Sequence, residues 1–137
     1  MAIIVPTREQ FKAFRDLPRD APVNMLNALK YKPKATYDAP PPCGGSPNVS
    51  GQTAYERYKV EFLKYLHSRD GRMLWEGTHE VSLIGTHMEW DAYFVAYYPS
   101  AQDFIDMQFD DSYVASLPHR NAALEDSILM RCAPVSK

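Results

Sequence analysis

The chain has 137 residues, the size of one domain, and its 45% hydrophobic content is enough to build a buried core. Its 15 basic and 17 acidic residues are interspersed and give a formal charge of -2. This balance argues against a basic nucleic-acid-binding stripe and against an acidic tail. We therefore expect one domain over residues 1–137 with no nucleic-acid partner.

The first residues, MAIIVPTREQ, lack the basic region, the long apolar core and the small-residue cleavage site of a signal peptide. The sequence has no run of about 18 apolar residues, the length that would predict a membrane-spanning helix. Cys43 and Cys132 are too few for a disulfide framework, and neither has metal-ligand spacing. We expect a cytoplasmic protein without a membrane partner.

The chain begins with a predicted helix over residues 7–17, which Thr7 caps and Pro18 ends. One face of this helix is apolar and carries Phe11, Phe14 and Leu17. Residues 22–31 follow as a predicted strand with apolar side chains at both odd and even positions. This pattern indicates a strand covered on both faces.

Residues 32–51 hold five of the eleven prolines and three of the six glycines, which excludes a helix or a central strand. Compact domains seldom keep a structureless loop of about 20 residues without a use. The segment is therefore either a partly disordered insertion, or a functional lid or dimer-contact arm.

A helix over residues 52–71 is predicted by apolar side chains at helical spacing, and Gly71 is expected to adopt the left-handed turn at its end. Residues 72–85 alternate as a half-buried strand with a bulge at Gly77. After a turn at 86–90, residues 91–98 form a strand that is apolar on both faces.

Ser100 and Asp103 form a capping-box pattern that begins the next helix. A second helical piece starts near Asp110, and Pro118 is expected to open a third piece, since proline suits the first helical position. Residues 127–134 are the last predicted strand.

The predicted order after the first helix is strand, helix, strand, strand, helix, strand. It predicts an α+β ferredoxin-like fold over residues 22–132, with a four-stranded antiparallel sheet. Right-handed crossovers place both helices on one face of the sheet. The other face is apolar and needs a cover, and a second copy of the same sheet in a homodimer is the expected one.

Three stretches resemble a known family: GRMLWEG, EWDAYFVAYYPSAQDFIDM and DDSYVASLPHRNAALEDS are similar to the bacterial domain of unknown function 1330, a member of the dimeric α+β barrel superfamily. The positions that carry the resemblance are Gly71, Arg72, Tyr98, Pro99, Ser100, Tyr113 and Arg120. Helix 7–17 and loop 32–51 look like additions to the family core. The resemblance implies a dimeric barrel. The superfamily includes cofactor-independent monooxygenases, lactone isomerases, haem-dependent dismutases and stress proteins, so the fold guides the chemistry only by association.

His119 and Arg120 are the candidate catalytic residues. The guanidinium of Arg120 stays charged and offers a planar set of donors to a carboxylate or enolate oxygen, and His119 could move a proton near neutrality. The alternative is structural: Arg120 pairs with Asp110, Asp111 or Asp126, and His119 caps a helix end.

Candidate ligand-binding residues are Asn24, Trp75 and Tyr97, joined through the resemblance by Tyr113. Asn24 and Asn27 lie in an apolar strand, and a buried amide needs partners, since leaving it unpaired costs about 1–3 kcal/mol. Those partners are a ligand, a neighbouring loop or a dimer contact. The alternative for Trp75 is plain core packing.

No metal and no cofactor are expected. His79 and Glu80 begin a metalloprotease-like motif that Val81, Ser82 and Leu83 do not complete. Phosphate-binding glycine loops and nucleophile elbows are also absent from the sequence.

Together these features predict a homodimer that binds a small, mostly apolar or anionic molecule between sheet and helices. If it is an enzyme, isomerisation or cofactor-free oxidation fits best, with Asn24, Trp75 and Tyr97 shaping the pocket. The alternative is a non-catalytic binding or interaction protein with a purely structural dimer.

Overall fold

The computed structural model describes residues 5–42, 44–85 and 89–135. In chain order its elements are α1 Arg8–Asp16, β1 Val23–Tyr31, α2 Gly51–Ser68, β2 Arg72–Thr78, β3 Ala92–Tyr98, α3 Ala101–Met107, α4 Asp111–Ala123 and β4 Leu124–Cys132.

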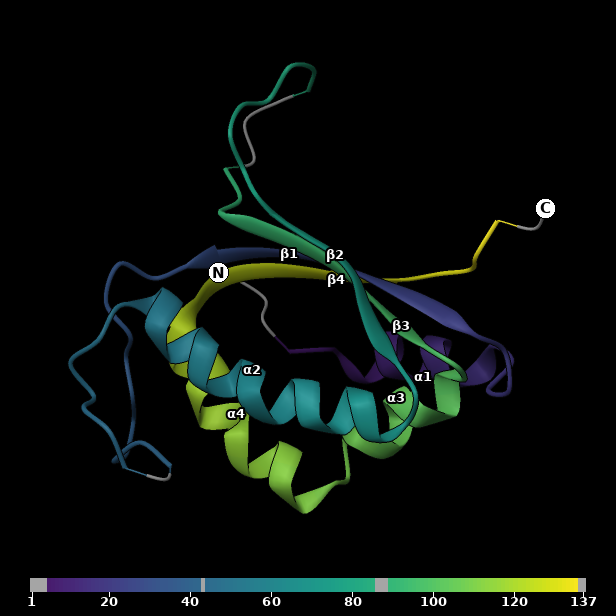
Figure 1. Cartoon of the computed structure of the whole chain (residues 1–137), viewed down its shortest axis with the longest axis horizontal. Helices are drawn as coiled ribbons and strands as arrows, with labels where there is room; N and C mark the ends of the chain where they lie inside the picture. The colour runs from purple at the N-terminus through teal and green to yellow at the C-terminus, as the bar shows by residue number, and fades with distance from the viewer. Residues whose placement is uncertain (1–4, 43, 86–88, 136–137) are drawn as a thin grey trace.

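The four strands form one sheet in the order β2-β3-β1-β4, and each neighbouring pair is antiparallel. Figure 1 shows α2 and α4 side by side on one face of this sheet. Both crossovers lead back to the same face, as right-handed connections require. The predicted α+β ferredoxin-like fold with helices on one face is confirmed.

The two faces of the sheet differ because successive strand residues point to opposite sides. The helix-facing side belongs to the core, with Val23, Met25, Leu29, Phe94, Ala96 and Tyr98. The other side, here called the open face, carries Asn24, Leu26, Ala28, Trp75, Tyr93, Val95, Tyr97, Ile128 and Met130. Figure 1 shows no helix over the open face.

Helix α2 begins at the cap Ser50, whose side chain accepts a hydrogen bond from the backbone N–H of Thr53. At its end Asp70 adopts the left-handed conformation with φ 61°, so the prediction that Gly71 does so is wrong. Gly71 serves close packing instead. A Cβ there would come within 2.5 Å of Leu66 Cδ1.

Strand β2 is shorter than predicted and ends at Thr78 rather than Gly85. The predicted bulge at Gly77 is wrong, because the shift in pairing register with β3 lies between Met73 and Trp75. This bulge turns Met73 toward the helices, opposite Ala96, and Trp75 toward the open face, opposite Val95. Gly77 has a different use, since a Cβ there would meet the indole ring of Trp75 at 2.5 Å.

Helix α4 runs without a break through Pro118, so the prediction that Pro118 opens a separate helical piece is wrong. Proline removes one hydrogen bond to the carbonyl of Val114. Pro118 and Val114 are both exposed, so water can satisfy that carbonyl. Strand β4 then begins at Leu124, three residues before its predicted start.

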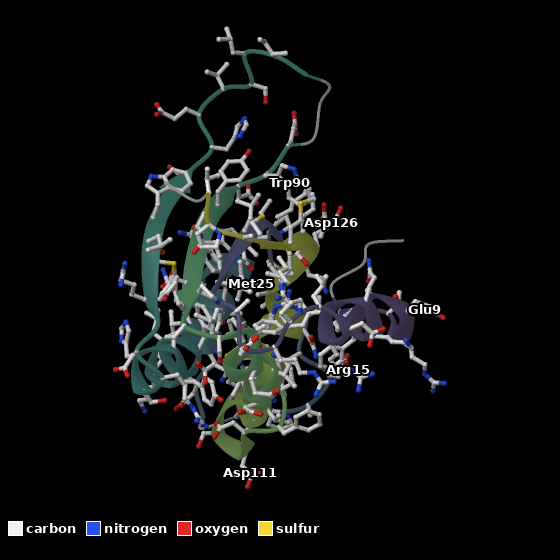
Figure 2. The ribbon with its side chains drawn as sticks, turned by 90° about the vertical axis from the view of Figure 1, so that its right-hand side faces the viewer. Glu9, Arg15, Met25, Trp90, Asp111 and Asp126 are labelled. Atoms are coloured by element: carbon white, nitrogen blue, oxygen red, sulfur yellow. The ribbon has the colours of Figure 1, made fainter. Side chains whose placement is uncertain are left out.

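The predicted N-terminal helix is confirmed as α1, with Thr7 and Gln10 forming a capping box. Its Phe14 ring lies 5.0 Å from that of Phe104 in α3. Arg131 of β4 donates to the carbonyl of Phe14 at 3.0 Å and to that of Pro18 at 2.6 Å. Figure 2 shows α1 at the side of the sheet.

Loop 32–51 connects β1 to α2, and its described part up to Ser50 has no helix or strand, as predicted, whereas Gly51 already begins α2. Its backbone is nevertheless bonded to the end of α4. The N–H groups of Lys32 and Thr36 donate to the carbonyls of Ala123 at 2.8 Å and Ala122 at 3.0 Å. These bonds favour a covering flap over a disordered insertion.

Candidate functional site

A cluster of polar groups lies in the core between the helices and the sheet. It comprises Tyr55 and Tyr58 from α2 and Tyr113 and Arg120 from α4, and we call it the tyrosine–arginine cluster. Tyr113 and Arg120 are seven residues apart, or about two helical turns, and therefore lie on the same side of α4. The sequence analysis predicted both as site residues, and the fold brings them together.

The hydroxyls of Tyr58 and Tyr113 form a buried hydrogen bond of 2.8 Å, with ring centroids 5.7 Å apart. Burial raises the pKa of both phenols above its usual value. They are therefore neutral near neutral pH. Two neutral hydroxyls that share one hydrogen bond retain one further O–H proton to donate.

The guanidinium of Arg120 lies close enough to act on three buried phenols. Burial raises the pKa values of Tyr55, Tyr58 and Tyr113, and the charge of Arg120 partly opposes this rise in each. Arg120 also donates to the hydroxyl of Ser127 on β4 at 3.4 Å. A positive charge and phenolic donors thus converge beneath the sheet.

Two carboxylates that were alternative partners of Arg120 have backbone partners. Asp110 is the N-cap of α4 and accepts from the backbone N–H of Tyr113 at 3.0 Å. Asp126 accepts from the backbone N–H of Ser127 at 2.8 Å. Asp111 lies exposed in the first turn of α4, as Figure 2 shows. Each of these two carboxylates thus accepts a backbone hydrogen bond.

His119 is buried and contacts loop 32–51. Its Nδ1 lies 2.7 Å from the hydroxyl of Tyr37, which accepts from Nη1 of Arg57 at 3.2 Å. The histidine ring also bonds to the backbone of Pro42. We call Tyr37, Arg57 and His119 the loop latch. A neutral imidazole suits it best, with Nδ1 accepting from Tyr37 and Nε2–H donating to the Pro42 carbonyl.

The loop latch predicts pH-dependent docking of the loop. Burial, and then the charge of Arg57, lower the pKa of His119 in the docked state. Neutral His119 therefore stabilises docking fully at pH values above the ordinary histidine pKa of about 6.5. This stabilisation is lost as the pH falls through the lower pKa of the docked state. We expect the backbone amide of Thr36, bonded to Ala122, to lose hydrogen-exchange protection between pH 7.5 and pH 5, after correction for intrinsic exchange.

The control for this pH effect is Tyr37→Phe, which removes the hydroxyl between Arg57 and His119. This variant is expected to lower the protection of Thr36 already at pH 7.5 and to flatten its pH dependence. Equal protection of the unmodified chain at both pH values would contradict the latch.

Asn24, Trp75 and Tyr97 lie on the open face, on the other side of the sheet from Arg120. The prediction that they shape a pocket between sheet and helices is therefore wrong within one subunit. The alternation of β-strand side chains separates them from the tyrosine–arginine cluster. On the open face the guanidinium of Arg72 lies 5.1 Å from the ring centre of Tyr97.

The two strand asparagines have different surroundings. Asn27 faces the helices, and its amide donates to the carbonyl of Met25 at 3.0 Å, so its own strand supplies a partner. Asn24 faces the open side, and its Oδ1 is buried without a hydrogen-bond partner among the described residues. A buried acceptor left unpaired is costly, which makes Asn24 a candidate for an intermolecular bond.

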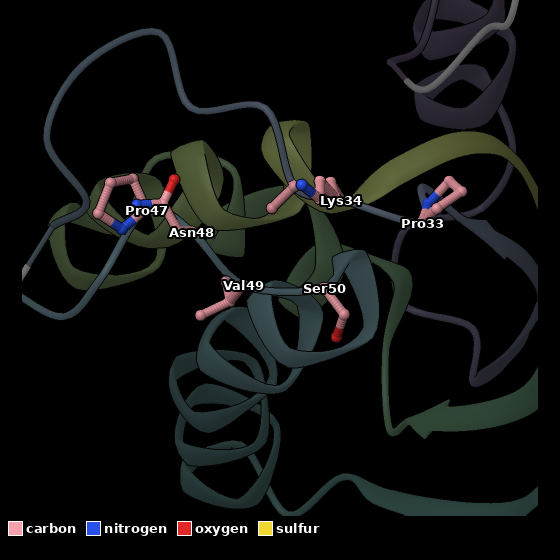
Figure 3. A pocket seen from close by; sticks show the side chains of 7 residues that line it. Pro33, Lys34, Pro47, Asn48, Val49 and Ser50 are labelled. Atoms are coloured by element: carbon pink, nitrogen blue, oxygen red, sulfur yellow. The ribbon is translucent and has the colours of Figure 1, made fainter.

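A recess of about 300 Å³ lies between the two ends of loop 32–51 (Figure 3). Its lining comes from Pro33, Lys34, Ala35, Pro47, Asn48, Val49 and Ser50. None of the predicted site residues lines it.

Within residues 5–42, 44–85 and 89–135, no group of three or more histidine, cysteine, aspartate or glutamate side chains is arranged to hold a metal. In the same part of the chain no helix has the length and apolar character needed to cross a membrane. Cys132 is an exposed free thiol.

The sequence analysis missed Tyr37, Arg57 and the polar role of Tyr58. Tyr55 and Tyr58 are among the side chains whose helical spacing predicted the helix over residues 52–71, and the sequence analysis placed them only on its apolar face. A tyrosine on a buried face needs a hydroxyl partner, and this was the available signal. Tyr37 and Arg57 carry no such signal, since Tyr37 meets His119 across 82 residues and Arg57 bonds to Tyr37 across 20.

Comparison with known proteins places this geometry in a family. The model of the family described as Domain of unknown function (DUF1330) matches residues 45–131. A crystal structure of a protein of unknown function from Rhodopseudomonas palustris is 35% identical, covers 100% of both chains and has a TM-score of 0.88. The methylated form of that protein is 37% identical, with a TM-score of 0.86, and covers 98% of this chain and 96% of the other.

A more distant structure is the hydroxynitrile lyase from Passiflora edulis, with 10% identity and a TM-score of 0.57. The match covers 86% of this chain and 97% of the lyase, and it shows a shared fold alone. No curated protein matches the sequence. The family match over residues 45–131 and the relative that is 35% identical over the whole length agree. The chain belongs to the family of the domain of unknown function 1330.

Proposed function

We propose that the protein is a cytoplasmic homodimer that binds a small, partly apolar, anionic molecule at the tyrosine–arginine cluster. The observation that carries the proposal is the buried hydroxyl pair of Tyr58 and Tyr113, with Arg120 two turns from Tyr113 on the same helix and its charge acting on the pKa of both phenols. A guanidinium and an O–H donor are the groups that a carboxylate or enolate oxygen prefers. The surrounding rings favour an apolar remainder of the ligand.

The chemistry open to this cluster is the stabilisation of an oxygen that gains negative charge. Arg120 supplies a fixed positive charge, and the second proton of the Tyr58–Tyr113 pair supplies a hydrogen bond. An isomerisation through an enolate, or a cofactor-free oxidation, would use this arrangement. His119 would act as the proton carrier only after leaving Tyr37, because its Nδ1 is bonded to Tyr37 and its ring also bonds to the backbone of Pro42.

Homodimerisation through the open face is supported by its exposed apolar side chains. Leu26, Trp75 and Met130 are exposed there on three different strands. A contiguous patch of this kind is rare on a monomer and typical of an interface. The unpaired Oδ1 of Asn24 lies on the same face and would accept a bond across a two-fold axis.

The second candidate is a non-catalytic interaction protein with a structural dimer. It is favoured by the hydrogen bonds within the loop latch, where Tyr37, Arg57 and His119 satisfy one another. In that case the tyrosine–arginine cluster only stabilises the core.

A thermal-shift screen with small carboxylates and enolisable carbonyl compounds tests the first candidate. A ligand at about 100 times its dissociation constant stabilises the protein by about 2.7 kcal/mol. We expect Arg120→Met to weaken a hit by about 10- to 100-fold, because a charge-assisted hydrogen bond contributes about 1.5–3 kcal/mol. The matched control is Arg19→Met, which removes an exposed arginine whose side chain donates to the carbonyl of Arg15.

Two results would count against ligand binding at the cluster. The first is a flat screen, which favours the interaction protein. The second is a hit whose affinity survives Arg120→Met, which places the ligand elsewhere.

A further inference from the structure

The connection between β2 and β3 carries an exposed apolar tip. Its outgoing leg, residues 79–85, is here called the arm. Val81 is 79% exposed, and Leu83 and Ile84 are each 92% exposed. In Figure 1 the arm rises from the sheet on the side opposite α2 and α4, which is the side of the open face. Figure 2 shows the same rise from a direction at right angles.

The base of the arm is held in place by His79. Its backbone N–H donates to the carbonyl of Asp91 at 3.0 Å, which extends the pairing of the two legs beyond Thr78. Its ring contacts the hydroxyl of Tyr93 through Nδ1 and that of Ser82 through Nε2, the latter at 3.2 Å. The arm therefore leaves the sheet in a defined direction and presents its aliphatic side chains.

We infer that the arm crosses to the second copy of the chain and packs Val81, Leu83 and Ile84 against it. This inference rests on the proposed homodimer and names a second contact of that dimer. Packed sheets lie about 10 Å apart, and an extended chain advances about 3.3 Å per residue. The five steps from Thr78 to Leu83 span at most about 16 Å, enough to pass the plane of the partner's sheet.

Two-fold symmetry makes the contact reciprocal, so that two arms flank one interface. The arm adjoins the open face, because Tyr93 belongs to the open face and also bonds to His79 at the arm's base. A dimer that covers the open face therefore brings the partner within reach of the arm.

The charges near the arm favour protein over a lipid surface. No lysine or arginine occurs between Arg72 and Arg120, whereas Glu80 and Glu89 flank the tip. Segments that bind anionic membranes carry basic residues beside their apolar ones. The open face instead offers the guanidinium of Arg72 to the acidic arm of a second copy.

Sedimentation equilibrium of the full chain with the double substitution Leu83→Ser and Ile84→Ser tests the arm. We expect the dimer dissociation constant to rise at least ~100-fold, since each dimer loses four buried aliphatic side chains. The circular dichroism spectrum is expected to stay unchanged, because both side chains are exposed in the isolated subunit. The matched control is Val60→Ser with Phe109→Ser, which removes two exposed apolar side chains from the helical side and leaves the constant unchanged.

Three other outcomes would each overturn the arm contact. If the unmodified protein is a monomer, the proposed homodimer fails and the arm contact fails with it. If it is a dimer whose constant the arm substitutions leave unchanged, the arm inference alone fails. If those substitutions abolish binding to phosphatidylcholine vesicles and spare the dimer, the arm contacts lipid and the inference is overturned.

Discussion

Trp75→Glu is expected to convert the proposed homodimer into a folded monomer. Trp75 is 55% exposed at the open face, opposite Val95 on the neighbouring strand. In a face-to-face dimer a glutamate at this position would bury one carboxylate per subunit in an apolar interface, which costs several kcal/mol. The symmetry doubles the effect, so we expect the dissociation constant to rise by at least ~1000-fold. Light scattering at micromolar concentration measures the resulting mass.

The matched control for Trp75→Glu is Phe109→Glu. Phe109 is 74% exposed in the turn between α3 and α4, away from the open face. This variant should remain a dimer. An unchanged dimer mass for Trp75→Glu would remove the open face as the interface, whereas a monomeric mass for both variants would show that added charge alone separates the subunits.

Gly51→Ala is expected to destabilise the subunit by about 3 kcal/mol, at the upper end of ordinary overpacking. A Cβ at this first residue of α2 would lie 2.3 Å from the carbonyl oxygen of Lys32 and 2.6 Å from that of Ala123. These are backbone atoms, so no side-chain rotation relieves the contact. The loop, α2 and the end of α4 would have to separate. Urea unfolding at fixed protein concentration measures the change.

Gln52→Ala is the control for Gly51→Ala, because Gln52 is the next residue of the same helix and is exposed. Its effect should stay within about 0.5 kcal/mol. A loss below about 1 kcal/mol for Gly51→Ala would mean that the three segments separate easily. The loop would then be held mainly by the latch at His119.

The existence and order of the elements followed from local patterns. The caps at Thr7, Ser50 and Ser100 all accept the backbone bonds that a helix start requires. Such signals act over three or four residues and depend little on the rest of the fold. Their order was enough to specify the ferredoxin-like topology, because handedness and chain connectivity leave few alternatives.

Details that depend on packing escaped the local patterns. The bulge between Met73 and Trp75 shifts the alternation of β2, and nothing in the residue pattern marks it there. Helix α4 continues through Pro118 because the affected turn is exposed, a fact that only the docked helix shows. The left-handed residue at the end of α2 is Asp70, whereas Gly71 is required for its close contact with Leu66.

The candidate site was likewise only partly predictable from the sequence. The sequence by itself singled out Arg120 and Tyr113 as site residues but assigned them to two helical pieces. They share a helix face because α4 continues through Pro118, and residues seven apart on one α-helix lie on the same side. Only the tertiary structure decided which groups meet them. It brought Tyr58 to Tyr113 across 55 residues, placed His119 in the loop latch, and put Trp75 and Tyr97 on the far side of the sheet. The physical reason is that helical and strand periodicities are local properties, whereas contacts between elements depend on how their faces dock.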